Sequence, residues 1–140
     1  MVKDSQTGLY PEKYFNEFLA FEKKRCERSE DPVFLMLADL SAFTDESKRQ
    51  KIAQSMMDAL SAVTRDTDVK GWHVDGLVMG IIFTEMAYQG TTSKMVQRYV
   101  ASKCLWSLKS HLGEEAFSRI QIRWQQLHSE HIPEIHTVSQ

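Results

Sequence analysis

The residues that come nearest to a metal-binding motif stand close to the C-terminus. His128, Glu130, His131 and His136 are all side-chain types that can coordinate a transition metal. His128 and His131 lack the i, i+4 spacing that makes two histidines on one helical face into ready ligands. Because the surrounding stretch is polar, a solvated tail is the favoured interpretation. No Ser-His-Asp arrangement, glycine-rich phosphate loop or paired-carboxylate motif is visible in the sequence.

Length and composition exclude several classes of protein. The chain has 140 residues, which is enough for one domain with one core. Its 17 basic and 19 acidic residues give a net charge of -2, whereas domains that coat nucleic acid are usually strongly basic. No apolar run reaches the roughly 18 residues of a membrane span, and the first residues lack the apolar core of a signal peptide. Cys26 and Cys104 form no CxxC motif, which favours reduced, mostly buried thiols in a cytoplasmic protein.

Hydrophobic periodicity divides the chain into elements. Apolar residues recur at helical spacing over residues 11–28, 45–64 and 93–112, which predicts three helices. The continuous apolar run at residues 33–38 is typical of a strand that is covered on both faces in the middle of a sheet. Gly113 is a plausible residue to end the third helix, because glycine readily adopts positive φ.

The remaining apolar segments predict strands. Residues 69–74 and 77–83 are joined by Asp75-Gly76, a strong signal for a two-residue hairpin turn. Residues 120–125 alternate between apolar and polar types, which indicates a half-exposed strand. The order helix, strand, helix, hairpin, helix, strand favours an α/β domain in which helices pack on a mixed sheet.

Three stretches also resemble a known family. Residues 4–15 read DSQTGLYPEKYF, residues 37–43 read LADLSAF, and residues 65–68 read RDTD just before the hairpin. In order and spacing they resemble the motifs D-x-L-T-G-L-x-N-R-R-x-F, L-x-D-[IL]-D-x-F and R-x-x-D of GGDEF domains, the diguanylate cyclase family. The resemblance implies a GGDEF-like, ferredoxin-related α/β (α+β) domain over residues 1–127. Its central mixed sheet would be flanked by helices and trimmed at the C-terminal edge, with a polar tail at residues 128–140.

The sequence departs from the family where the catalytic metal would bind. The family's signature turn corresponds here to residues 74–78, which read VDGLV. The acidic residue that binds Mg²⁺ in the family is replaced by Gly76, and the next acidic residue is replaced by Leu77. Asp39 remains as a vestigial metal-binding residue, and a single carboxylate makes a weak site for Mg²⁺ and a triphosphate.

The nucleotide-binding parts differ as well. Ser41 and Thr44 replace the family's second Asp and its phosphate-side Lys, and the loop that reads guanine is missing before the second helix. Phosphoryl transfer depends on positioning and on charge stabilisation by metal ions. The resemblance therefore predicts a domain without catalytic residues, cofactor or metal, and hence without cyclase activity.

One functional motif of the family matches residue by residue. Arg65 and Asp68 occupy the R-x-x-D positions that in many GGDEF domains bind the product cyclic di-GMP away from the catalytic site. Arginine offers a planar fork to a guanine edge or a phosphate, and aspartate accepts hydrogen bonds from guanine. Arg98 in the next helix is a candidate for a completing basic residue. The structural alternative is that Arg65 and Asp68 simply cap a helix end and pair at the surface.

Two functional hypotheses follow for a non-catalytic signalling domain of bacterial type. The first is a cyclic di-GMP receptor that uses Arg65 and Asp68. The second is a protein–protein interaction or scaffold domain, binding a partner protein or a second copy, without nucleotide binding. For the other notable side chains, a structural role is favoured for His73, and Trp72 and Trp124 are expected on the sheet, where exposure of either would mark an interface.

Overall fold

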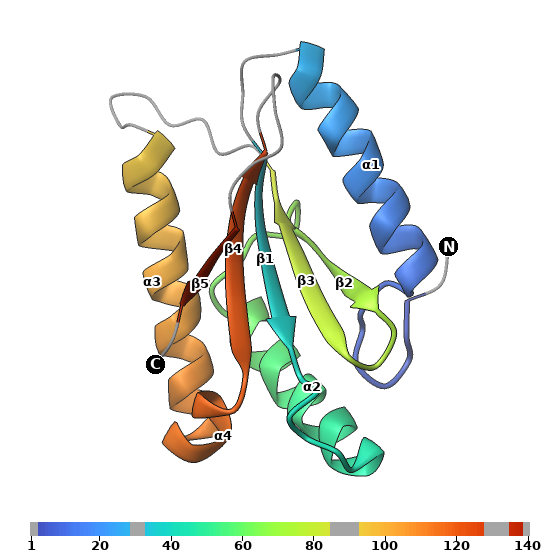
Figure 1. The fold of residues 1–140 in the computed structure, drawn as a ribbon, viewed down its shortest axis with the longest axis vertical. Helices are drawn as coiled ribbons and strands as arrows, with labels where there is room; N and C mark the ends of the chain where they lie inside the picture. The colour runs from blue at the N-terminus through green and yellow to red at the C-terminus, as the bar shows by residue number, and fades with distance from the viewer. Residues whose placement is uncertain (1–2, 29–32, 85–92, 128–134, 139–140) are drawn as a thin grey trace.

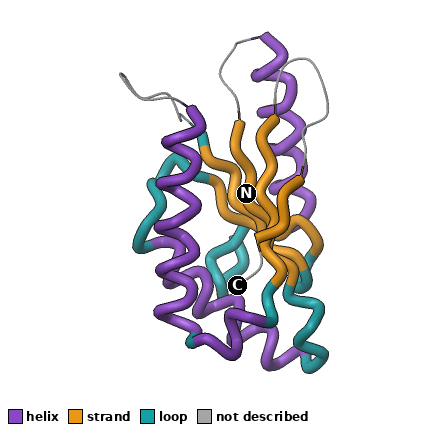
Figure 2. The backbone as a smooth tube through the Cα atoms, turned by 60° about the vertical axis from the view of Figure 1, so that its left-hand side comes forward, coloured by secondary structure: helices purple, strands orange, loops and turns teal. Residues whose placement is uncertain are grey.

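The computed structural model describes residues 3–28, 33–84, 93–127 and 135–138. In chain order the elements are α1 (Glu12–Arg28), β1 (Val33–Asp39), α2 (Glu46–Ser61), β2 (Val69–Val74), β3 (Val78–Phe83), α3 (Ser93–Leu112), α4 (Glu114–Ser118), β4 (Gln121–Leu127) and β5 (Ile135–Val138). The strands form one sheet in the order β2-β3-β1-β4-β5. Helix α1 covers one face of this sheet, while α2 and α3 cover the other (Figures 1 and 2).

The central position predicted for the first strand is confirmed. β1 pairs along its length with β3 on one side and with β4 on the other. Its buried residues alternate between two cores, with Phe34, Met36 and Ala38 on the α2–α3 side and Val33 and Leu35 on the α1 side. A continuous apolar run is therefore required here, because neither face of this strand meets solvent.

The expected fold class is confirmed, but the sheet does not combine parallel and antiparallel strand pairs as expected. All four described strand pairings are antiparallel, and the one parallel contact is an isolated bridge between Tyr10 and Gly71. The reason lies in the crossovers. β1 and β2, joined by α2, run parallel but have β3 between them, and β3 and β4, joined by α3, have β1 between them. Each crossover helix therefore connects two parallel strands that are not neighbours in the sheet. The strand that lies between them runs in the opposite direction, so every pairing is antiparallel.

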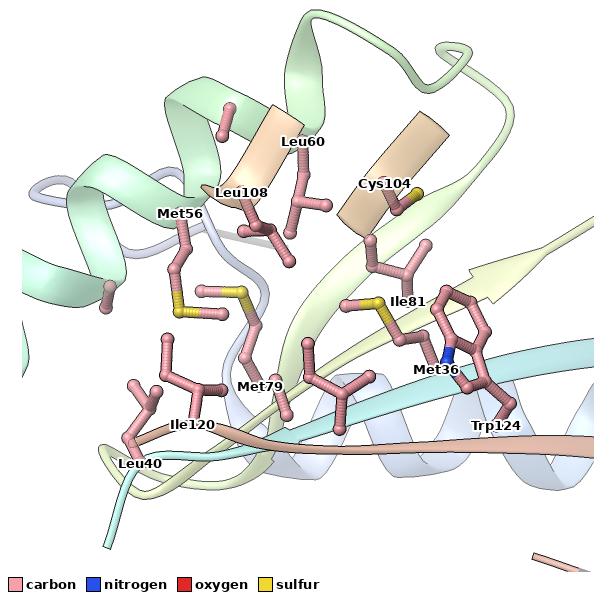
Figure 3. Close-up of a cluster of buried hydrophobic side chains, with 14 of the residues drawn as sticks. Met36, Leu40, Met56, Leu60, Met79, Ile81, Cys104, Leu108, Ile120 and Trp124 are labelled. Carbon is pink, nitrogen blue, oxygen red and sulfur yellow. The ribbon is translucent and has the colours of Figure 1, made fainter. Parts of the chain in front are cut away.

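The larger core lies between the sheet and the helices α2 and α3 (Figure 3). Side chains from the sheet, α2 and α3 meet there, including Met36, Met56, Leu60, Met79, Ile81, Cys104, Leu108 and Trp124. Among these, Trp124 stacks on Phe34 with ring centroids 5.3 Å apart. Met36, Met56 and Met79 fill this core, whereas Met95 of α3 is exposed, and both cysteines are free and buried.

The smaller core depends on a pair of glycines. Gly71 of β2 and Gly80 of β3 lie directly opposite each other, and both face α1. The ring of Phe15, which is fully buried, occupies the space above them. A Cβ atom at position 71 would stand 2.8 Å from Cδ1 of Phe15, and one at position 80 would stand 2.8 Å from Cε2. Helix α1 can therefore approach the sheet closely only because these two positions lack side chains.

The helix ends follow local rules. Asp45 caps α2 by accepting a hydrogen bond from Ser47 N at 3.2 Å. Gly113, with φ of 84°, ends α3 as predicted and also precedes the short helix α4, which the sequence did not predict. β5, which pairs with β4, was not predicted either, since it lies in the stretch interpreted as a polar tail. None of the described helices is both long enough and apolar enough to cross a membrane.

Candidate functional site

The hairpin turn lies at the predicted position, but its loop is longer than the two residues expected, because Val74 pairs with Val78 and residues 75–77 lie between them. Leu77 N donates a hydrogen bond to Val74 O at 3.0 Å, which closes the turn around Asp75 and Gly76. Gly76 has φ of 74°, a conformation that favours glycine. Leu40 N donates to Leu77 O at 2.8 Å, so the turn lies directly beside the end of β1.

Asp39 stands at that end of β1. It lies opposite Val78 on β3 and Gln121 on β4. Its carboxylate accepts a hydrogen bond from Ser41 N at 2.9 Å, which ties it to the backbone of its own loop. Gly76 and Leu77 bring no second carboxylate to it from the turn. Within the described residues there is no group of three His, Cys, Asp or Glu side chains that could hold a metal ion.

A guanidinium group bridges the same turn and the loop after β1. Arg49 Nε donates to Gly76 O at 3.2 Å, and Nη1 donates to Phe43 O at 2.9 Å and to Thr44 O at 3.3 Å. Arg49 belongs to none of the motifs visible in the sequence. The feature of the sequence that could have drawn attention to it is its position in the first turn of α2, where acidic residues are favoured and a cation is unusual. Here the side chain turns back toward loop carbonyls, which accept hydrogen bonds from a charged donor.

Asp75, the remaining acidic residue of the turn, is bound to α1. Asp75 Oδ1 accepts a hydrogen bond from Glu12 N at 3.0 Å, and Glu12 Oε1 accepts one from Asp75 N at 2.8 Å. Because the first backbone N–H groups of a helix have no partner within the helix, Asp75 acts as a remote cap for α1. This carboxylate is therefore engaged in holding the fold together.

His73 forms a second link between α1 and the hairpin. Its Nδ1 lies 2.7 Å from Asn16 Oδ1, and Asn16 Nδ2 donates to His73 O at 3.0 Å. Burial lowers the pKa of His73 below its ordinary value, and Glu12 acts in the opposite direction. These contacts agree with the structural role that the sequence favoured.

Arg65 and Asp68 are brought together, but by contacts within the protein. Asp68 is buried, and its Oδ2 accepts a hydrogen bond from Arg65 N at 2.9 Å. Its Oδ1 accepts from Arg65 Nη2 at 3.3 Å and from Thr84 N at 3.3 Å. Arg65 Nη2 also donates to Thr84 O, although 42% of the Arg65 side chain remains exposed. Asp68 thus holds the α2–β2 loop against the end of β3.

Charged and polar groups surround this pair. Lys70 Nζ donates to Thr64 Oγ1 at 3.0 Å, and burial lowers the pKa of Lys70 while Asp68 opposes that shift. Arg98 lies on the exposed side of α3, and the contacts of Asp68 do not include it. The pairing of Arg65 with Asp68 was anticipated, whereas the burial of Asp68 was not, because it depends on where β3 ends.

The remaining candidates from the sequence are the tryptophans and the histidine-rich group near the C-terminus. Trp72 and Trp124 are buried, so neither marks an interface, whereas Trp106 of α3 is exposed. Of the histidine-rich group near the C-terminus, His128, Glu130 and His131 lie outside the described residues, and only the backbone of His136 is described.

Comparison with known proteins identifies the fold. No protein-family model matches the sequence, and no curated protein matches it either. Solved structures do match. The GGDEF domain of FimX from Pseudomonas aeruginosa has a TM-score of 0.70 at 12% identity, covering 94% of this chain and 83% of that one. The GGDEF domain of DgcB from Caulobacter crescentus, solved with c-di-GMP, has a TM-score of 0.62 at 14% identity, covering 89% and 75%.

A third match is a complex. The diguanylate cyclase SiaD from Pseudomonas aeruginosa, solved with its activator SiaC, has a TM-score of 0.64 at 17% identity, covering 89% of this chain and 49% of that one. At these identities the similarity concerns the arrangement of the backbone. Together with the split order of β1, β2, β3 and β4, the matches show that this chain has the fold of a GGDEF domain.

Proposed function

We propose that this chain is a non-catalytic GGDEF-fold domain of a cyclic di-GMP signalling system, located in the cytoplasm. The observation that carries the proposal is the composition of the turn beside Asp39. Gly76 and Leu77 stand where a cyclase needs carboxylates for its metal, so Asp39 is a vestigial metal-binding residue. Mg²⁺ bound with a nucleotide triphosphate usually requires one or two carboxylates in octahedral geometry together with phosphate oxygens.

The position of Arg49 strengthens this argument. Its guanidinium spans the carbonyl groups of Phe43, Thr44 and Gly76, which places a fixed positive charge between the hairpin turn and the loop after β1. A cation bound nearby would be repelled by this charge. The arrangement thus lacks one metal ligand and already contains a positive group.

The experiment is a cyclase assay on the purified chain. GTP would be supplied with Mg²⁺ or Mn²⁺, the products separated by chromatography and cyclic di-GMP identified by mass spectrometry, with an active diguanylate cyclase run alongside. We expect no cyclic di-GMP above a protein-free blank. Formation of cyclic di-GMP that disappears in Asp39→Asn would overturn the proposal, because it would make Asp39 a working metal ligand.

The domain could act either by docking a partner protein or by receiving the nucleotide. The internal contacts of Asp68 favour docking. Asp68 is buried and already accepts hydrogen bonds from Arg65 and Thr84, so a guanine base could reach its carboxylate only if these neighbours moved, and an N–H left buried without a partner by that movement would cost roughly 1–3 kcal/mol. A protein-interaction domain requires no such release.

The receptor remains the second candidate because Arg65 is partly exposed and already oriented by Asp68. Calorimetry with cyclic di-GMP separates the two functions. A receptor would bind at micromolar concentration and lose binding in Arg65→Ala and Arg98→Ala, while Lys24→Ala, an exposed cation on α1, would bind unchanged. Absence of heat in the wild-type protein supports the docking function. Circular dichroism of Arg65→Ala shows whether that variant remains folded.

A further inference from the structure

Helix α3 carries an exposed apolar line on its outer side. Among the described residues, five large hydrophobic side chains are exposed, and three of them are Met95 at 59%, Tyr99 at 63% and Trp106 at 71%. Positions i, i+4 and i+11 fall on one side of a helix, so the three side chains form a single line along α3. Cys104 and Leu108 on the other side are fully buried in the larger core.

The same helix is basic over its whole length. Its lysine and arginine residues are Lys94, Arg98, Lys103 and Lys109, and its 20 residues contain no aspartate or glutamate. Lys103 Nζ lies 4.8 Å from the centroid of the Tyr99 ring. Since the chain as a whole has a net charge of -2, α3 concentrates positive charge beside the apolar line. In Figure 1 this helix lies at the outer left edge of the molecule.

We propose that the outer side of α3 is a docking site for an acidic protein surface. Tryptophan, tyrosine, methionine and arginine are enriched in protein–protein interfaces, and the few residues that carry most of the binding energy are most often tryptophan, tyrosine or arginine. The cations beside the line require a partner of opposite charge, because complementary charges steer association and exclude wrong partners. This inference rests on the proposed function and names the surface through which a non-catalytic domain would act.

The charge also argues against a second copy of this chain as the occupant. A symmetric contact would place α3 of one protomer against α3 of its partner, because two-fold interfaces use the same surface twice. Lys94, Arg98 and Lys103 would then face other cations without any acidic residue on either α3, while Lys109 is already paired with Glu114 of α4, with its Nζ 3.2 Å from Glu114 Oε1. Like charges across an interface are unfavourable.

The test selects binders without assuming their sequence. Random peptides of about 16 residues, roughly four helical turns, would be displayed on phage and selected on the purified full chain. Selected peptides would be synthesised and titrated against the wild-type protein, Trp106→Ala and Phe21→Ala. Phe21 of α1 is also exposed, at 64%, and serves as the matched control. Because Trp72 and Trp124 are buried, a change in tryptophan fluorescence on binding that is absent in Trp106→Ala reports contact at Trp106.

We expect the selected peptides to be acidic and their affinity to fall at least about tenfold in Trp106→Ala, with less than a twofold change in Phe21→Ala. The double variant Arg98→Glu, Lys103→Glu should weaken binding by a similar factor, and added salt should weaken it in the wild type. Since Trp106, Phe21 and Arg98 are exposed and Lys103 is only half-buried, circular dichroism should show the variants to be folded.

Four results would overturn the proposal. They are selected peptides that are neutral or basic, binding that is equal in Trp106→Ala, binding to vesicles of phosphatidylcholine and phosphatidylglycerol that depends on Trp106 and is not competed by the peptides, and dimerisation that Trp106→Ala abolishes. None of these results depends on cyclase activity. The docking site and the absence of catalysis can therefore fail separately.

Discussion

Phe15 packs its ring directly over Gly80, so α1 approaches the sheet at a point where β3 has no side chain. We expect Gly80→Ala to destabilise the protein by about 1–3 kcal/mol, because the added methyl group would force the ring or the helix to move. Urea unfolding measures this change. Phe15→Leu should reduce the penalty of Gly80→Ala in a double-mutant cycle, since a smaller side chain leaves room for the methyl group. Additive effects would show that the two residues do not restrict each other.

A second prediction concerns the guanidinium between the hairpin and the loop after β1. Arg49→Ala removes donors from Gly76 O, Phe43 O and Thr44 O, and we expect a loss of about 1–2 kcal/mol in the free energy of unfolding. Lys51→Ala, an exposed cation on the same helix, is the matched control and should change stability by less than about 0.5 kcal/mol. Equal effects in the two variants would mean that the three carbonyl contacts contribute nothing.

The buried carboxylate of Asp68 provides a third prediction. Asp68→Asn should destabilise the protein by about 1–3 kcal/mol, because the amide nitrogen cannot accept the hydrogen bonds that Arg65 and Thr84 donate. Asp66→Asn, an exposed neighbour, controls for the change in net charge. Thermal unfolding of both variants checks this expectation, and a midpoint for Asp68→Asn equal to that of Asp66→Asn would contradict it.

The pH dependence of stability should reveal His73. The pKa of His73 in the folded protein lies below its ordinary value of 6.5, chiefly because burial disfavours the imidazolium form. Well above 6.5 the ring is neutral in both states and contributes no pH dependence. As the pH falls through 6.5 the unfolded chain takes up the proton first, so stability decreases until the pH passes below the folded pKa.

Urea unfolding at intervals across this range measures the effect. His73→Gln should show a smaller loss of stability between neutral and mildly acidic pH than the wild-type protein. An identical decline in the variant would show that other groups cause the pH dependence.

The two thiols should react only after the protein opens. Burial raises the pKa of the Cys104 thiol to about 12, and burial also raises the pKa of Cys26. Because the thiolate is the reactive form, labelling with a disulfide reagent near pH 8 should be slow in the folded protein. The labelling rate should rise with urea in parallel with unfolding. Rapid labelling in the absence of urea would show that one thiol reaches solvent in the native state.

Local patterns in the sequence were sufficient for most of the fold. The apolar run of β1, the Asp75-Gly76 turn and the helical stripes each reflect short-range physics, and all were placed to within a few residues. What the sequence did not reveal depends on register and on distant contacts. The pairing of Gly71 with Gly80, for example, has no local signature, because the two glycines matter only when β2 and β3 align them under Phe15.

The same limit applies to the candidate site. The proposed replacement of acidic residues by Gly76 and Leu77 follows from resemblance to a motif, since it is defined by position in the chain. The role of Arg49 could not be found in this way, because its hydrogen-bond acceptors lie in another loop and in a hairpin 27 residues away. The burial of Asp68 was equally invisible, as it is produced by Thr84 at the end of β3.

The bridge formed by Arg49 has a further consequence for how this region responds to its surroundings. An ion held by carboxylates can dissociate, and a chelator can remove it, so such a loop changes shape with ionic composition. A guanidinium attached to α2 cannot leave, and arginine keeps its charge at any physiological pH. The distance between the hairpin and the loop after β1 is therefore set once, at folding, and EDTA should leave it unaltered.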